Sequence, residues 1–135
     1  MRHKATLTLV NWILINQPDI KSIGILGGSS REPELLELQR IYPNAEVTYL
    51  GIEQGFQDIP FVALDLNEST DIRQAFDIVV CSQVLEHVWN LDNSIINLSK
   101  IINPRGGFLW LNCPASNMVH GSPEYFSAGY SHKMI

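Results

Sequence analysis

Short apolar runs and segments of helical periodicity alternate along the chain. Runs that are continuously apolar or rich in β-branched residues predict β-strands at 22–26, 46–52, 60–64, 76–81 and 107–113. Apolar residues three or four positions apart predict helices at 5–17, 31–42 and 91–102. Because the predicted strands show little alternation of apolar and polar residues, we expect an α/β fold with a parallel sheet and helices on both faces.

The predicted helices have definable faces and ends. The first has two apolar sides, which are formed by Leu9, Trp12 and Ile13 and by Leu7, Val10 and Leu14. The second is expected to begin with a capping box of Ser29 and Glu32, with Pro33 in its first turn. The third places on one face the residues Leu91, Ile95, Leu98 and Ile102.

The composition predicts a folded protein and argues against some classes of binding partner. The 135 residues, 45% of them hydrophobic, suffice for a single domain over residues 1–135. Nine Lys and Arg against 14 Asp and Glu give a net charge of −5. This charge argues against general binding to nucleic acid and against anionic membrane surfaces.

The N-terminal segment has the outline of a secretory signal peptide, since Arg2 and Lys4 precede an apolar stretch. The stretch is interrupted by Thr6, Thr8 and Asn11, and no small-residue cleavage site follows it. It is also too short to span a bilayer. We therefore interpret it as an amphipathic helix and expect a cytoplasmic protein.

The two cysteines lack the spacing of a disulfide framework or a metal site. Cys81 and Cys113 each lie in an apolar run, so we expect buried free thiols in a reducing compartment. The sequence predicts no metal site.

The residues that follow the predicted strands carry the candidate chemistry. In an open parallel sheet, ligands bind beyond the carboxyl ends of the strands. The residues at these ends are Gly27, Gly28, Ser29, Ser30, Glu53, Asp65, Ser82 and Gln83. One crevice can receive all of them.

Each position has a functional and a structural explanation. The glycines let the backbone approach a ligand beside a helix N-terminus, or they form only a tight turn. Glu53, 25 residues after Gly28, can accept both hydroxyls of a ribose, or it is a solvated loop carboxylate. Asp65 can accept from the exocyclic amine of adenine, or it forms an N-cap or Asx turn.

Longer segments carry a family resemblance. Residues 76–88 (FDIVVCSQVLEHV) resemble the fourth-strand motif of class I S-adenosylmethionine-dependent methyltransferases, and residues 103–109 (NPRGGFL) resemble the turn that opens their fifth strand. Residues 120–127 resemble a segment that follows this strand in many small-molecule members. The resemblance covers residue 5 to about residue 130. It implies a Rossmann-like, doubly wound parallel sheet of about five strands in the order 3-2-1-4-5.

The resemblance also implies S-adenosyl-L-methionine as cofactor and a small-molecule methyl acceptor. It assigns cofactor contacts to Gly27, Gly28 and Ser29 (methionine part), Glu53 (ribose), Asp65 and Leu66 (adenine), and Ser82 and Gln83 (crevice border). It places His87 near the transferring methyl group, as a base or acceptor-binding residue, and Tyr125 and Tyr130 at the acceptor site. The alternatives are a structural histidine that caps a short helix and tyrosines that pack on the sheet.

Two features depart from the family pattern. Ile25 stands where the family has an acid that helps to hold the methionine amino group of the cofactor. Family members also continue into a further helix and two strands, so residues 108–111 would leave an apolar sheet edge. Because such an edge invites pairing, we expect a homodimer.

The main hypothesis is therefore a methyltransferase that acts on a small molecule. The alternative is a non-catalytic or degenerate methyltransferase-like domain that acts as a binding or partner subunit, which both departures favour. A nicotinamide dinucleotide-binding domain ranks lower, because Gly24, Gly27 and Gly28 lack the G-x-G-x-x-G spacing.

Overall fold

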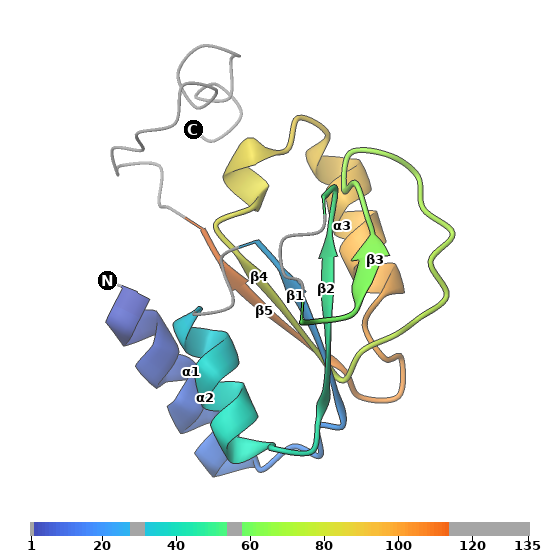
Figure 1. The fold of residues 1–135 in the computed structure, drawn as a ribbon. Coiled ribbons are helices and arrows are strands. Elements are labelled where there is room, and N and C mark those ends of the chain that lie inside the picture. Colours follow the sequence, from blue (N-terminus) through green and yellow to red (C-terminus); the bar gives the residue numbers. More distant parts are fainter. Residues whose placement is uncertain (1, 28–31, 54–57, 114–135) are drawn as a thin grey trace.

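The two strands with the most continuous apolar sequence lie in the middle of the sheet. β1 (Ser22–Leu26) pairs with β4 (Ile78–Ser82), and all of β4 is buried, as is β1 from Ile23 onward. Strands covered on both faces need apolar residues at every position, which explains their sequences. The computed structural model describes residues 2–27, 32–53 and 58–113 (Figure 1).

The sheet has five parallel strands in the order β3-β2-β1-β4-β5, which confirms the predicted topology. The outer strands are β2 (Glu46–Gly51), β3 (Phe61–Ala63) and β5 (Phe108–Asn112). Leu26 pairs with Leu50 of β2 and with Cys81 of β4. The carboxyl ends of these three strands are therefore level, and the segments that follow them share one edge of the sheet.

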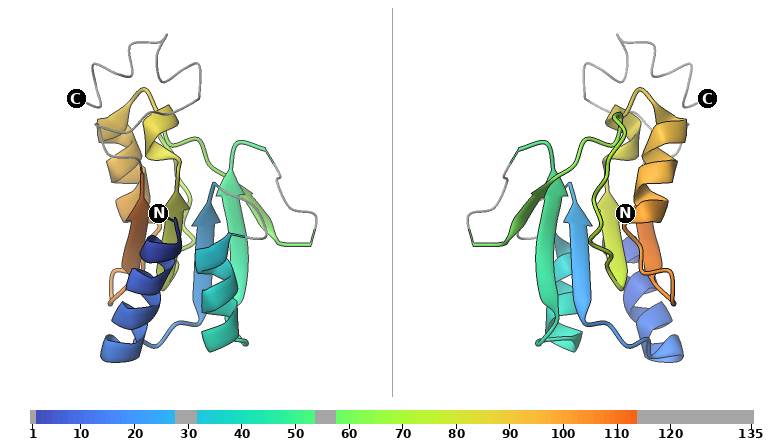
Figure 2. Two further views of the ribbon diagram at one scale, coloured as in Figure 1. Left: turned by 90° about the vertical axis from the view of Figure 1, so that its left-hand side faces the viewer. Right: turned by 90° about the vertical axis from the view of Figure 1, so that its right-hand side faces the viewer.

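Helices cover both faces of the sheet, as predicted (Figure 2). They are α1 (Arg2–Asn16) and α2 (Pro33–Ile41) on one face and α3 (Leu91–Lys100) on the other. On α1, Leu9 and Ile13 are buried against the sheet, while Leu7 and Leu14 are exposed. Within the described ranges, no helix is both long and apolar enough to cross a membrane.

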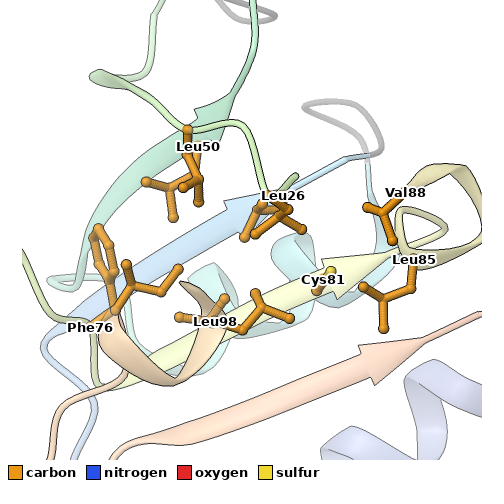
Figure 3. Close-up of a cluster of buried hydrophobic side chains, with 11 residues drawn as sticks. Leu26, Leu50, Phe76, Cys81, Leu85, Val88 and Leu98 are labelled. Atoms are coloured by element: carbon orange, nitrogen blue, oxygen red, sulfur yellow. The ribbon is translucent and has the colours of Figure 1, made fainter. Parts of the chain in front are cut away.

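An apolar cluster on the α3 side extends along the sheet, from Phe76 before β4 to Leu85 and Val88 beyond its carboxyl end (Figure 3). Leu26, Leu50 and Cys81 pack in one cluster with Leu85 and Val88, which follow β4. Burying one such side chain contributes about 1.5–3 kcal/mol. The cluster therefore holds the segment after β4, including the 3₁₀ turn η1 (Leu85–His87), firmly on the sheet.

The predicted capping box of α2 is wrong. Ser29 lies outside the described residues, and the helix begins at Pro33, so Glu32 is the N-cap residue and its side chain forms no cap. The Glu32 carboxylate is buried and accepts a hydrogen bond of 3.0 Å from the Ser82 hydroxyl instead. A contact between residues fifty positions apart has replaced the local one.

The predicted face of α3 is also partly wrong. Leu98 is buried as expected, but Leu91 and Ile95 are 48% and 47% exposed. The buried positions include Ser94 and Asn97, whose side chains donate to backbone carbonyl groups between β3 and β4. Because these buried donors find acceptors there, the helix turns a partly polar face inward.

Within the described residues the last strand is an edge strand, as expected for residues 108–111, and its side chains are only partly buried. Within the described residues β5 pairs only with β4, and Leu109 and Leu111 are 37% and 40% exposed. Cys113, which follows β5, is exposed, so the expectation that both cysteines are buried is wrong for this one. Cys81 is buried as predicted, and both thiols are free.

Candidate functional site

A pocket of about 490 Å³ opens at the carboxyl edge of the sheet. Its described lining comes from the ends of three strands and from the segment after β4: residues 26–27, 49–53, 64–67, 84, 87 and 88. The level strand ends bring these segments together. Gly27, Glu53, Asp65, Leu66 and His87 were expected at the site from the sequence, and all five line the pocket.

Gly27 forms the tight turn that begins the pocket after β1. Its φ is +74°, a backbone conformation that favours glycine. A Cβ at this position would lie 2.4 Å from Cγ2 of Val84 and 2.5 Å from the Ser82 carbonyl oxygen. The chain after β1 therefore lies against the chain after β4. Gly28 and Ser29, the other predicted backbone contacts, lie outside the described residues.

The two acids predicted to bind the cofactor both line the pocket, one beyond β2 and one beyond β3. Glu53 is exposed just beyond β2. Asp65 follows β3, and its Oδ1 accepts a hydrogen bond of 3.0 Å from the backbone N–H of Asn67. The Asx turn considered as the alternative for Asp65 is thus present, and it holds the carboxylate at the pocket wall.

The segment that carries Asp65 is anchored by α3. The backbone carbonyl of Leu66 accepts hydrogen bonds from Asn93 Nδ2 (3.2 Å), Ser94 Oγ (3.2 Å) and Asn97 Nδ2 (3.0 Å). Ser94 and Asn97 are fully buried. The two amide donors fix the orientation of that peptide, and the single Ser94 hydroxyl hydrogen is shared between this carbonyl and that of Asn90, at 2.8 Å. This wall of the pocket is therefore preorganised.

The two polar residues at the end of β4 do not line the described pocket. Ser82 is fully buried with its hydroxyl bonded to Glu32. Gln83 has a φ of +57°, and its Nε2 donates to Oδ1 of Asn112 at 3.4 Å. Their predicted contact with the cofactor stays a prediction.

His87 lies on the pocket wall after β4, next to a buried carboxylate. Its Nε2 is 3.6 Å from Oε1 of Glu86, whose side chain is fully buried. When the imidazole is protonated, this pair becomes an ion pair. The buried carboxylate therefore lies against one edge of the imidazole ring.

The protein interior beside the site disfavours charge. Burial first, and then the neighbouring Glu86 carboxylate, raise the pKa of the Cys81 thiol to about 12. In the part of the chain that the structure describes, no cluster of three or more His, Cys, Asp and Glu side chains is arranged to hold a metal ion.

The charge of the pocket indicates the kind of ligand that it suits. Its described lining contains Glu53 and Asp65 but no Lys or Arg. Such a lining suits hydroxyl and amine donors or a cationic centre better than phosphate groups.

The pocket includes residues that the sequence did not predict. Tyr49, Leu50, Asn67 and Val84 line it without a chemical motif in the sequence to indicate them. Asn67 in particular had no signal beyond its position two residues after Asp65. The predicted acceptor residues, which are Tyr125 and Tyr130, lie outside the described residues.

Comparison with known proteins identifies the fold. No protein-family profile and no curated protein sequence matches the chain. Among solved structures, the plantazolicin methyltransferase BpumL superposes with a TM-score of 0.59 at 12% identity, over 97% of this chain and 55% of that one. The CMeT domain of the citrinin polyketide synthase gives 0.58 at 16% identity, over 80% and 34%. Coclaurine N-methyltransferase gives 0.55 at 16% identity, over 78% and 35%.

These likenesses show that the chain has the fold of the class I S-adenosylmethionine-dependent methyltransferases. The chain spans about a third to a half of the length of these structures. The identities are too low to transfer an activity or a substrate along with the fold.

Proposed function

We propose that the chain binds S-adenosyl-L-methionine and takes part in methyl transfer to a small molecule. The observation that supports this proposal is the pocket at the carboxyl edge of a methyltransferase-like sheet, whose lining includes both Glu53 and Asp65. The neighbours support it, since coclaurine N-methyltransferase and BpumL were each solved with S-adenosylhomocysteine and a small organic ligand.

Each wall of the pocket has a role in this proposal. Glu53 accepts hydrogen bonds from the ribose hydroxyls, and Asp65 with Leu66 holds the adenine ring. Gly27 lets the backbone approach the methionine part. The bound cofactor supplies a methyl group on a positively charged sulfur, which the acidic and otherwise uncharged described lining attracts.

The wall after β4 faces the reacting end of the cofactor. When a hydroxyl or amine acceptor bonds to the methyl carbon and the bond from that carbon to the cofactor sulfur breaks, His87 would take up the proton that the acceptor loses. Glu86, 3.6 Å from Nε2, stabilises the resulting imidazolium. The remaining contribution is alignment of acceptor and methyl group in a site that excludes water.

Isothermal titration with S-adenosylmethionine and S-adenosylhomocysteine tests the proposal. Replacing Glu53 with Ala should weaken binding by about 1–3 kcal/mol, because a charge-assisted pair of hydrogen bonds is lost. Glu46→Ala is the matched control, since Glu46 is an exposed carboxylate at the opposite end of the same strand. Equal affinity of Glu53→Ala and wild type would refute the ribose assignment, and no binding by wild type would refute the cofactor proposal.

A non-catalytic binding subunit is the second candidate. Ile25, fully buried in β1, stands where an acid would help to hold the methionine amino group. An apolar side chain there offers no acceptor for an ammonium group. Binding of S-adenosylhomocysteine without transfer to any acceptor in a panel of alcohols, amines and phenols would favour this candidate.

We further propose that two copies associate through the edge of β5. The N–H of Phe108 donates to the Asp77 carbonyl and the carbonyl of Asn112 accepts from Gln83 N, so both groups point toward β4. Because backbone groups alternate in direction along a regular parallel strand, those of Leu109 and Leu111 point away from β4. A two-fold axis at Trp110 would place Leu109 opposite Leu111 of the second copy. Antiparallel pairing in this register would satisfy the outward groups of both copies.

Light scattering at micromolar concentration tests this association. Leu111→Lys should give monomers, because charged residues on an edge oppose strand pairing. Leu91→Lys, a change at an exposed leucine of α3, should leave the dimer intact. A monomeric wild type would contradict the proposal.

A further inference from the structure

The two walls of the pocket are joined by the side chain of Asn67. This residue lines the pocket, and its Oδ1 accepts two backbone hydrogen bonds, from Trp89 N at 2.9 Å and from Asn90 N at 3.0 Å. These partners lie 22 and 23 residues further along the chain. A single amide oxygen therefore ties the segment after β3 to the segment between η1 and α3.

The segment bound by the Asn67 side chain directly follows the pocket wall that carries His87. Trp89 and Asn90 follow His87 and Val88, which line the pocket. Asn90 is also the N-cap of α3, and its own Oδ1 accepts from Asn93 N at 3.1 Å. Fixing the Asn90 backbone therefore fixes both the start of α3 and the end of the wall that carries His87.

The backbone of Asn67 holds the opposite wall. Its N–H donates to Oδ1 of Asp65, and the preceding carbonyl, that of Leu66, is held by three side chains of α3. Asn67 thus contacts the predicted adenine wall through its main chain and the His87 wall through its side chain. In the described chain, Asn67 Oδ1 is the acceptor for both backbone bonds that join these two segments at residues 89 and 90.

We infer that Asn67 is a positioning residue, which sets the distance between the adenine-binding wall and the His87 wall. The inference rests on the proposed function for the identity of the ligand. Without the two hydrogen bonds, residues 87–90 can adopt more conformations, and only some of these conformations can bind the cofactor. Apparent affinity falls in proportion to the competent fraction.

Two substitutions at this position separate the acceptor from the rest of the side chain. Asn67→Ala removes the acceptor oxygen and both bonds. Asn67→Asp keeps an oxygen of the same geometry, next to the N-terminus of α3, where negative charge is favoured. Asn67→Ala should raise the dissociation constant for S-adenosylhomocysteine roughly tenfold, while Asn67→Asp should stay within about threefold of wild type.

Asn103→Ala is the matched control for general loss of stability. Asn103 Oδ1 also accepts a backbone bond, from Arg105 N at 3.0 Å, and its Nδ2 donates to Asp77 at 2.9 Å, but it lies outside the pocket lining. Both alanine variants lose hydrogen bonds, so both should be less stable to urea. Only Asn67→Ala should bind S-adenosylhomocysteine more weakly.

Amide hydrogen exchange supplies a readout that needs no ligand. Asn67→Ala should speed exchange at residues 87–90 by at least about tenfold, and Asn103→Ala should not. Unchanged exchange there, or equal affinities of wild type and Asn67→Ala, would overturn the positioning role. A wild type that binds no S-adenosylhomocysteine would instead refute the proposed function, and the exchange data alone would then decide whether Asn67 holds the two walls together.

Discussion

Replacing Gly27 with Ala should lower the free energy of unfolding by about 2–5 kcal/mol. The φ of +74° at this turn costs an L-residue about 1–2 kcal/mol. The added methyl group would lie 2.4 Å from Val84 Cγ2 and 2.5 Å from the Ser82 carbonyl oxygen. The valine can rotate, but the oxygen belongs to the end of the buried strand β4, so the clash adds about 1–3 kcal/mol.

Gly106→Ala separates the two contributions. Gly106 also has a positive φ, of +140°, but nothing lies within 4 Å of a Cβ built there. This variant therefore carries backbone strain without a clash, at a cost of roughly 1–3 kcal/mol. The Gly27 variant should be the less stable of the two by about 1–2 kcal/mol, the difference between the two expected ranges.

Urea unfolding followed by far-ultraviolet circular dichroism measures both variants. The transition midpoints give the difference, provided that the slopes with denaturant agree. The Gly27 variant should also bind S-adenosylhomocysteine more weakly, because the shift needed to admit the methyl group occurs at the pocket itself. If the Gly27 variant is no less stable than the Gly106 variant, the close approach of the chains after β1 and β4 is not a constraint on the fold.

Two further predictions concern titratable groups. Burial opposes ionisation of Asp77, but hydrogen bonds from the Asn103 side chain and the Lys21 backbone outweigh it and lower the pKa. Its stabilising effect is therefore present above the ordinary pKa of 3.8 and is lost as the pH falls through the lowered pKa. Asp77→Asn should be destabilising at neutral pH, and its free energy of unfolding in urea titrations should approach that of wild type as the pH falls below the lowered pKa. Burial raises the pKa of the Cys81 thiol to about 12. Iodoacetamide at about pH 8 should therefore label the exposed Cys113 and not Cys81 in the folded protein. Labelling of Cys81 at the same rate as Cys113 would contradict the burial of Cys81.

The sequence determined the sheet and the place of the site. The continuous apolar runs of β1 and β4 can be satisfied only by burial on both faces, and these strands are central. The strand order was implied by the family resemblance of residues 76–88. Since parallel strands present their carboxyl ends at one edge, Gly27, Glu53 and Asp65 could be assigned to one pocket from their positions alone.

Tertiary structure decided which polar side chains are structural. Periodicity put Leu91 and Ile95 on the inner face of α3, yet Ser94 and Asn97 are buried, because the carbonyl of Leu66 accepts their hydrogen bonds. In the same way, no pattern in the sequence indicates that the Ser82 hydroxyl donates to the buried Glu32 carboxylate.

The hydrogen bonds by which Asn67 joins the two pocket walls were also decided only by the tertiary structure. Its partners, the N–H groups of Trp89 and Asn90, come within reach only after β3 and the start of α3 have taken their places around the sheet. Apolar burial depends on the character of each residue and leaves a periodic pattern in the sequence. A hydrogen bond needs one particular partner at about 3 Å, and no local pattern encodes a partner that the topology brings from a distant part of the chain.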